Sequence, residues 1–360
     1  MMARWMTVLL AAALLAAGRP VLAIDLGPEL SEPTTSAPSQ PASQPASRPA
    51  TEPTSLATTQ SASQPASAPT SLTWMTAFDE GLAQAGKADS LMLVFWFDPE
   101  SPACQAMQDK TFAQAELVRA LRGLALVRLD VTREGNKPRF AGQRAKRPPL
   151  TQTYSPASQL LDSLPGFLDG PGVLAMIQRS QQFLAADRQG RATPDDAQRR
   201  WAKVQARLAL SSRAQAGEDI DWLLARKPGQ LPPSITPARL QLALGQATQQ
   251  TDPVKARQAF EQARTLAGED TVSAACALLG LAELAIQAES YSRAHDLLDQ
   301  YIREYPAGQS IGKVAIRKAS IEINALDNRP AARATLEEFL RKYPDDPAVV
   351  QAKELLEALK

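Results

Sequence analysis

The residues that could carry out chemistry stand together in the segment Ser101-Pro102-Ala103-Cys104. A cysteine in the first turn of a helix is a candidate nucleophile, because unpaired backbone N–H groups and the helix dipole stabilise a thiolate there. In a Cys-x-x-Cys pair the first sulfur attacks a disulfide and the second resolves the mixed disulfide. Here Ser101 stands at the attacking position, so only the resolving thiol, that of Cys104, is present.

A strand, a helix and a second strand are expected to position this segment. Residues 91–97 (LMLVFWF) form a continuous apolar run with the length and aromatic content of a strand buried on both faces. A turn then leads into residues that suit a helix, and residues 124–131 (LALVRLDV) predict a second buried strand. Upstream, Trp74, Phe78 and Leu82 recur every four residues, which predicts one apolar face of a first helix.

This unit resembles the thioredoxin-like superfamily, in particular its secreted members. In that family an apolar strand delivers a Cys-x-x-Cys pair to a helix, with Met three residues after the second Cys, and Thr-Phe and Val downstream. The matching residues here are Cys104, Met107, Thr111, Phe112 and Val118. The resemblance implies an α/β thioredoxin-like domain, which we place at residues 72–212.

The family also places a cis-proline just before a later strand, opposite the active-site turn. We expect that strand at residues 183–187 (FLAAD), followed by a hairpin at RQGR. The equivalent position then falls near Gln181, which is not a proline and has none beside it. Two parts of the redox apparatus are therefore expected to be absent. We predict a redox-inactive domain with no catalytic residue, in which Ser101 and Cys104 mark a degenerate redox position.

The role of Cys104 has alternatives. Most free cysteines behave as small buried hydrophobes, and we expect Cys104 to be one of them. The rival interpretation is an enzyme, a thiol-disulfide interchange protein that acts through Cys104 alone; a metal-sensing thiol is a third. The other cysteine, Cys276, lies in a different predicted domain, so we expect two free thiols although export would favour a disulfide.

Residues 132–172 are interpreted as a long, irregular insert. The sheet is expected to be smaller than usual for the family, because no clear second strand follows the RQGR turn. Its basic residues outnumber the acidic Glu134; they are Arg133, Lys137, Arg139, Arg144, Lys146 and Arg147. This charge could attract an anionic surface, although solvated basic loops are more common. Further on, Thr193 as N-cap and Pro194 at the first helical position predict a helix that runs to about Leu210 and closes the domain.

The first 71 residues divide into two segments. Residues 1–23 have the parts of a secretory signal: Arg4, an apolar stretch at 6–17, and Val21-Leu22-Ala23 as the cleavage pattern. The apolar stretch is shorter than the roughly 20 residues a bilayer span needs, so we expect no membrane span in the mature chain. Residues 24–71 are rich in Pro, Ser, Ala, Thr and Gln, which predicts a disordered linker. We expect a periplasmic or secreted protein.

In the remaining domain, residues 213–360, the chain repeats itself from about Ile235 onward with a spacing of 38 residues. Four sets of apolar positions align: Ala256, Ala294 and Ala332; Phe260, Leu298 and Leu336; Leu240, Leu278 and Ile316; and Ala247, Ala285 and Ile323. Gly268, Pro306 and Pro344 fall in register at the ends of helices. The pattern predicts three pairs of helices and a last helix at residues 347–359.

These spacings resemble the tetratricopeptide repeat. The endings REYP and RKYP are similar to those of the longer repeats in outer-membrane assembly lipoproteins and in the Tol-Pal coordinating protein. The resemblance implies a superhelix whose concave face binds another protein or a peptide. Four basic residues could line that face, although solvation is the default interpretation for each: Arg257, Arg317, Lys318 and Arg333. Self-association of the repeats is the rival interpretation.

Composition argues against several other functions. A net charge of +1 gives no nucleic-acid footprint, and no glycine-rich phosphate loop is present. One histidine and two separated cysteines cannot supply a zinc site or a histidine-dependent triad, so we expect no metal and no cofactor. By the repeat register His295 aligns with Arg257 and Arg333, which predicts a surface position. The sequence thus predicts an exported cell-envelope adaptor that binds a protein.

Overall fold

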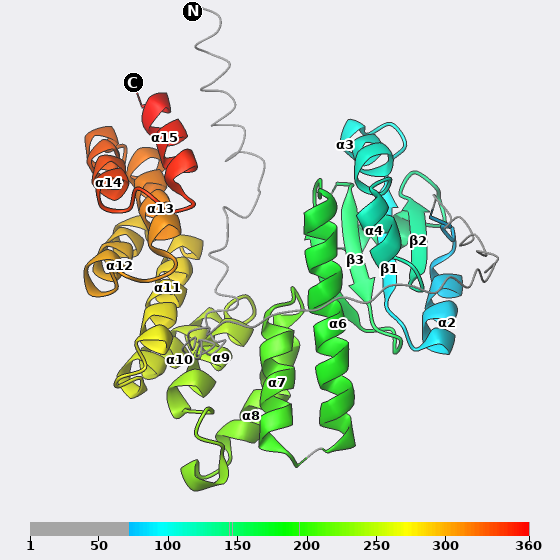
Figure 1. Cartoon of the computed structure of the whole chain (residues 1–360), viewed down its shortest axis with the longest axis horizontal. Helices are drawn as coiled ribbons and strands as arrows, with labels where there is room; N and C mark the ends of the chain where they lie inside the picture. The colour runs from blue at the N-terminus through cyan, green and yellow to red at the C-terminus, as the bar shows by residue number, and fades with distance from the viewer. Residues whose placement is uncertain (1–71, 144, 146, 194, 360) are drawn as a thin grey trace, which may run out of the picture.

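The computed structural model describes residues 72–143, 145, 147–193 and 195–359. The predicted signal peptide and linker, residues 1–23 and 24–71, lie outside the described residues. Figure 1 shows a sheet domain and a row of C-terminal helices, connected by the helices α6 and α7. Within the described part of the chain, no helix combines the length and the apolar character that crossing a membrane requires.

The sheet domain alternates strands with helices, as the apolar runs predict. Its elements are α2 (Phe78–Ala88), β1 (Met92–Phe97), α3 (Pro102–Ala106), the π-helical turn η1 (Met107–Thr111), α4 (Ala115–Ala120), β2 (Ala125–Asp130), α5 (Lys137–Ala141), β3 (Leu150–Tyr154), β4 (Leu160–Pro165) and α6 (Gly170–Ala192). The predicted strand, helix and strand around the Ser101 turn are therefore confirmed as β1, α3 to α4, and β2.

The four strands form one mixed sheet in the order β2-β1-β3-β4. β1 pairs with β2 in parallel, with Val94 opposite Val127, and with β3 in antiparallel fashion, with Val94 opposite Gln152. A parallel pair needs a crossover connection, which α3, η1 and α4 provide. Met75 adds an isolated parallel bridge to Val127 at the outer side of β2.

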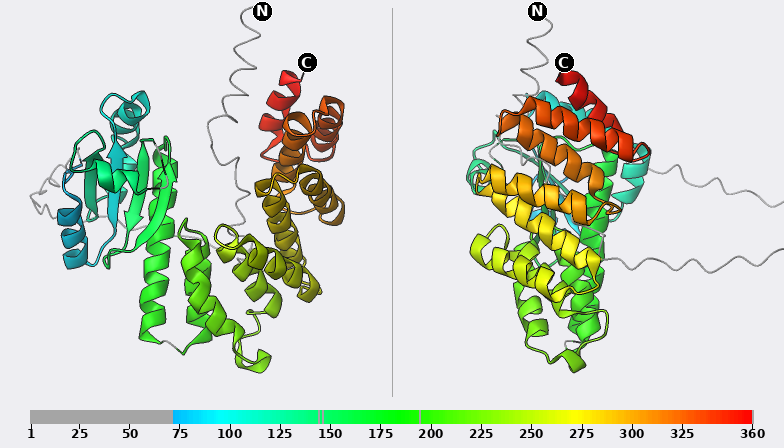
Figure 2. Two further views of the ribbon diagram at one scale, coloured as in Figure 1. Left: turned by 180° about the vertical axis from the view of Figure 1, so that it is seen from behind. Right: turned by 90° about the vertical axis from the view of Figure 1, so that its left-hand side faces the viewer.

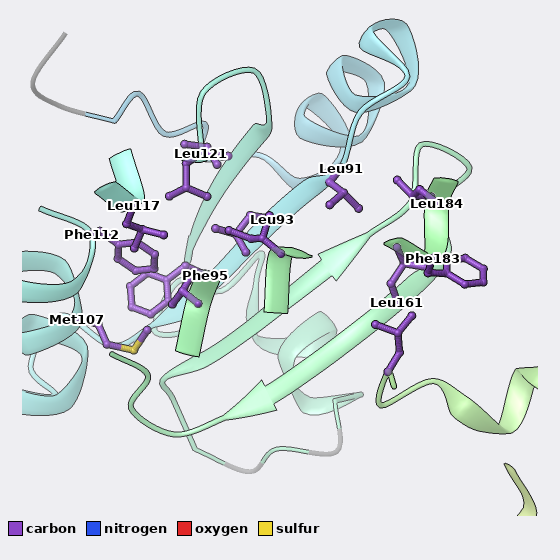
Figure 3. Close-up of a cluster of buried hydrophobic side chains, with 14 of the residues drawn as sticks. Leu91, Leu93, Phe95, Met107, Phe112, Leu117, Leu121, Leu161, Phe183 and Leu184 are labelled. Carbon is purple, nitrogen blue, oxygen red and sulfur yellow. The ribbon is translucent and has the colours of Figure 1, made fainter. Parts of the chain in front are cut away.

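Successive residues of β1 point to opposite faces of the sheet, and both faces are covered. Leu91, Leu93 and Phe95 enter a core with side chains of η1, α4 and α6, part of which Figure 3 shows. Met92, Val94 and Trp96 enter a second core that includes Ala85 of α2. All six side chains are at most 2% exposed, so each contributes about 1.5–3 kcal/mol of transfer free energy to folding.

The expectation for residues 132–172 was wrong, because this segment holds β3 and β4. β3 was not predicted because its sequence, LTQTY, contains no apolar run. All five of its residues are nevertheless buried. The side chain of Gln152 is hydrogen-bonded internally: Trp96 Nε1 donates to Gln152 Oε1 at 2.8 Å, and Gln152 Nε2 donates to Ser163 Oγ at 3.1 Å. The hydroxyls of Thr153 and Ser180 lie 2.7 Å apart.

Three further expectations need correction. Residues 183–187, predicted as a strand, lie inside α6, where Phe183 and Leu184 pack in the sheet core. Trp74 does not belong to the first helix, because α2 begins at Phe78. The helix predicted from Thr193 is present as α7 (Ala197–Leu208), but it starts later, where the side chain of Asp196 caps the Arg199 N–H.

Helix α7 packs on α6 and also contacts α9, so it belongs to both halves of the chain. Its Trp201 and Val204 share a core with Ile220 and Leu240, whereas Leu210, just after it, packs in the sheet core. The predicted boundary between residues 212 and 213 falls between α7 and the next short helix.

The side chain of Arg207 in α7 stabilises the junction between the sheet domain and the C-terminal helices. Its guanidinium carbon lies 3.5 Å from the ring centre of Phe183, and its nitrogens donate to Gln159 Oε1, Gln215 Oε1 and Ser212 Oγ at 2.9–3.1 Å. Burial lowers the pKa of Arg207 to about 10, and the nearby charges of Asp187 and Asp219 oppose that shift. A buried side chain thus links the β3–β4 turn, α6 and α7.

The C-terminal region is mostly helical. It contains η2 (Arg213–Ala216), α8 (Gly217–Leu224), η3 (Pro228–Gln230), α9 (Pro237–Thr248), α10 (Pro253–Leu266), α11 (Thr271–Gln287), α12 (Tyr291–Glu304), α13 (Ile311–Asn324), α14 (Arg329–Lys342) and α15 (Val349–Ala358). The helices α10, α12 and α14 each have 14 residues and begin 38 residues apart. Figure 2 shows the pairs stacked in chain order from α9 to α15.

Two of the aligned sets of repeat positions are fully buried. Ala256, Ala294 and Ala332 are each 0% exposed, and so are the next aligned set, Phe260, Leu298 and Leu336. Phe260 of α10 fits against two glycines, because a Cβ added at Gly245 or at Gly280 would lie 2.5 Å from its ring. Close approach of α9 and α11 to this ring therefore requires glycine at both positions.

We predict that Gly280→Ala lowers the free energy of unfolding by about 1–3 kcal/mol, because the added methyl group overlaps the Phe260 ring. This loss should occur although alanine has the higher helix propensity. Gly217→Ala is the matched control, since a Cβ there meets no atom within 4 Å. Urea unfolding followed by circular dichroism measures both, and a Gly280→Ala protein as stable as the wild type would contradict the packing.

Candidate functional site

The Ser101 turn connects the end of β1 to α3. Ser101 is the N-cap residue of α3; its N–H donates to Asp98 O at 3.1 Å and its carbonyl accepts from Gln105 N at 3.0 Å. The Gln105 side chain donates to Pro99 O at 2.7 Å, which holds the turn from the other side. The Ser101 hydroxyl makes no capping hydrogen bond and is partly exposed. No general base of the described residues bonds to it, so it lacks the activation that a serine nucleophile needs.

Cys104 is fully covered. It is 0% exposed, and its Sγ accepts a hydrogen bond from the Asp98 N–H at 3.4 Å. It packs in the core of the sheet face that also contains Phe95 and Met107. The predicted burial of Cys104 is confirmed, and neither Cys104 nor Cys276, which is buried in α11, forms a disulfide. A disulfide of another protein cannot reach this sulfur without local opening.

The residues on which the family resemblance depends are packing residues here. Cys104, Met107, Thr111, Phe112 and Val118 are all at most 6% exposed. The Thr111 hydroxyl donates to Leu168 O at 2.9 Å and so joins η1 to the loop before α6. These residues therefore hold the helical segment after the Ser101 turn against the sheet by packing. This role does not require a cysteine at position 101.

The expectation that the cis-proline is absent was wrong. The Pro148–Pro149 bond is cis and directly precedes β3, whose first residue, Leu150, pairs with Trp96 near the end of β1. Gln181, where the sequence placed this position, lies in α6. The error followed from the misplaced strand, so the argument for a redox-inactive domain now depends on Ser101 and on the burial of Cys104.

Carboxylates neutralise part of the basic segment at residues 132–172. Three of its side chains form ion pairs: Arg133 with Asp130 at 3.6 Å, Lys137 with Glu134 at 2.6 Å, and Arg139 with Asp79 at 3.3 Å. Arg139 also stacks on Phe78, 4.2 Å from the ring centre. Arg144 and Lys146 lie outside the described residues. These pairs weaken the case for an anion-binding surface.

The basic residues predicted for the concave face have different surroundings. Arg317 is 6% exposed and donates to Glu283 Oε2 at 2.9 Å, so the expectation of a solvated side chain was wrong. Burial raises the pKa of Glu283, and the charge of Arg317 only partly offsets this. Lys318 bonds Asp299 at 2.8 Å, and Arg333 donates to the Leu359 carbonyl at 3.0 Å. Arg257 alone of the four is exposed.

His295 is not the surface residue that the repeat register predicted. Its side chain is 27% exposed, and its Nε2 lies 2.9 Å from Oε1 of Glu322, whose side chain is 3% exposed. The same oxygen accepts from the Thr335 hydroxyl at 3.2 Å. The prediction from the repeat register failed because the partner of His295 comes from another helix, α13, and the aligned residues Arg257 and Arg333 have no such partner there. The signal available in the sequence was a glutamate on the apolar face of α13.

The first helices of the pairs offer little free surface. In α11, every residue from 275 to 285 except Glu283 is buried. The most exposed apolar side chains of this region lie near the ends of helices: Val254 (69%) and Leu266 (51%) in α10, Val272 (42%) at the start of α11, and Val350 (68%) at the start of α15. Any protein that binds this region therefore meets the second helices and the turns more readily than the first helices.

A comparison with known families agrees with this geometry. A family model described as thioredoxin-like matches residues 73–163, a range that contains the Ser101 turn, β1, β2 and β3. No curated protein matches the chain. The sheet domain is thus a thioredoxin-like α/β domain, and it is followed by a mostly helical region.

We predict that Asp299→Asn destabilises the protein at neutral pH and has little effect in acid. Partial burial raises the pKa of Asp299, but the hydrogen bond and charge of Lys318, with Arg303 and His295, outweigh it and hold the pKa below its ordinary value of 3.8. A carboxylate with a lowered pKa stabilises the fold above the unfolded pKa, and this stabilisation is lost as the pH falls through the folded pKa.

The expected loss is about 1 kcal/mol at pH 7 and smaller below about pH 4, measured by urea unfolding at several pH values. Asp345→Asn, at an exposed position, is the control. An equal loss at both ends of the pH range would contradict the ion-pair interpretation.

Proposed function

We propose that this protein is an exported adaptor of the cell envelope, in which a redox-inactive thioredoxin-like domain is joined to helical repeats that bind another protein or a peptide. The observation that carries the proposal is a serine hydroxyl at the attacking position, next to a Cys104 sulfur that is 0% exposed. Without an attacking thiolate the domain has no group that opens a disulfide.

Three features support recognition as the remaining role. The sequence begins with the pattern of a secretory signal, and its next segment has the composition of a spacer. The helix pairs α9 to α14 are of the kind that presents an extended surface to proteins. The exposed Val254 and Leu266 at the two ends of α10 provide apolar contact points.

The alternative is a thiol-disulfide interchange protein that acts through Cys104. We predict that the wild-type protein does not accelerate the reduction of insulin disulfides by dithiothreitol. Ser101→Cys should create measurable activity, because the new thiol stands at the N-terminus of the helix formed by α3 and η1. The double variant Ser101→Cys, Cys104→Ser is the control and should lose most of that activity. Wild-type activity that Cys104→Ser abolishes would establish the alternative.

If the helical repeats bind a partner, the mature chain should capture one envelope protein reproducibly. That capture should depend on α10. Replacement of both Val254 and Leu266 by glutamate should reduce its recovery at least tenfold, because both side chains are exposed and a charge opposes apolar contact. Gln258→Glu, an exposed residue of the same helix, is the matched control. Equal recovery by all variants would exclude this surface, and light scattering of the full chain tests self-association.

A further inference from the structure

A small open hollow lies between the segment before α2 and the helical turn η1. It has a volume of about 260 Å³ and is lined mainly by Leu72, Trp74, Phe95, Gln108, Phe112 and Arg128. Three of these are aromatic and hold one another: the Trp74 and Phe112 rings are 5.0 Å apart, edge to face, and the Phe95 and Phe112 rings 5.1 Å apart. Figure 3 shows Phe95 and Phe112 together at this end of the core. The apolar walls are therefore preformed.

Arg128 places a cation in this apolar wall. It follows Leu126 on the core-facing side of β2 and is half-buried. Its Nη1 donates to Gln108 Oε1 at 2.9 Å, and its guanidinium carbon lies 5.3 Å from the centre of the Phe97 ring. An arginine has five N–H donors, so one amide oxygen leaves most of them for another acceptor.

No carboxylate of the described residues forms an ion pair with Arg128. Two other partly covered arginines have one: Arg179 pairs with Asp162 at 2.9 Å and Arg200 with Asp219 at 2.8 Å. Asp130, the next residue on the same side of β2, is engaged elsewhere, since its Oδ1 accepts from Thr132 and its Oδ2 lies 3.6 Å from Arg133. A partly desolvated charge without a counter-charge is costly, so the hollow favours an anion.

We propose that this hollow binds the C-terminal residue of another polypeptide. The apolar side chain of that residue packs against Leu72, Trp74 and the small exposed part of Phe112, and its terminal carboxylate pairs with Arg128. A guanidinium forms two parallel hydrogen bonds with a carboxylate, which fixes the orientation of the ligand. A cationic ligand is repelled by Arg128, and a neutral apolar ligand leaves that charge uncompensated.

The size and openness of the hollow favour a chain end over a small molecule. Sites that enclose a whole drug-sized ligand measure about 300–1,000 Å³, more than the volume available here. An open hollow accepts one side chain and one carboxylate while the rest of the peptide leaves through the mouth. This site is separate from the helical repeats and from Cys104, so it goes beyond the proposed adaptor role.

The test uses the full mature chain and a fluorescent ten-residue peptide that ends in Leu-Phe with a free carboxylate. Fluorescence anisotropy should show saturable binding, and amidation of the peptide C-terminus should weaken it at least tenfold. Arg128→Gln should weaken the acid peptide at least tenfold and remove the difference between acid and amide. Arg119→Gln, at an exposed position of α4, should bind as the wild type does.

A second variant fills the hollow without touching its charge. Ala113 is exposed and lines the hollow, so Ala113→Phe should abolish binding of both peptides while the protein stays folded, and Ala113→Ser should bind normally. The proposal is overturned if no peptide binds saturably, or if the amide binds as tightly as the acid. It is also overturned if 3-phenylpropionate binds and no peptide competes with it, because the occupant is then a small acid.

Discussion

Burial of β1 on both faces is the constraint on which the sheet domain depends. Because the strand alternates Leu91, Leu93 and Phe95 with Met92, Val94 and Trp96, neither face of the sheet can be left to water. One face requires η1, α4 and α6, and the other requires α2. The Ser101 turn lies directly at the end of this strand, so its position is fixed by hydrophobic packing and does not require a second cysteine.

The sequence was sufficient where a fold signal is periodic or continuous. Apolar runs located β1 and β2, and the 38-residue spacing placed α10, α12 and α14 in register. It was insufficient for β3, because the polar side chains of Gln152 and Thr153 are buried with hydrogen bonds to residues far along the chain. A polar residue in a sequence carries no sign of whether a distant partner will satisfy it.

The same reasoning explains what could be predicted of the site. Ser101 and Cys104 are neighbours in sequence, so their spacing revealed both the motif and its missing sulfur. The cis bond before Pro149 was missed because its position follows from β3, and His295 was misplaced because Glu322 comes from another helix. Trp74 and Arg128 are far apart in the sequence, and the Met75–Val127 bridge brings their segments together.

Helix α7 has a further consequence. It contributes Trp201 to the core that it shares with Ile220 and Leu240. Its buried Arg207 contacts Phe183 of α6 and Gln159 in the turn between β3 and β4. A helix that packs against both regions in this way connects them without a flexible hinge. It therefore sets the spacing between the sheet and the stacked helices. A ligand bound to the sheet domain therefore meets the stacked helices at a fixed distance and orientation. This raises the effective concentration for its second contact when the geometry of the ligand matches that of the protein.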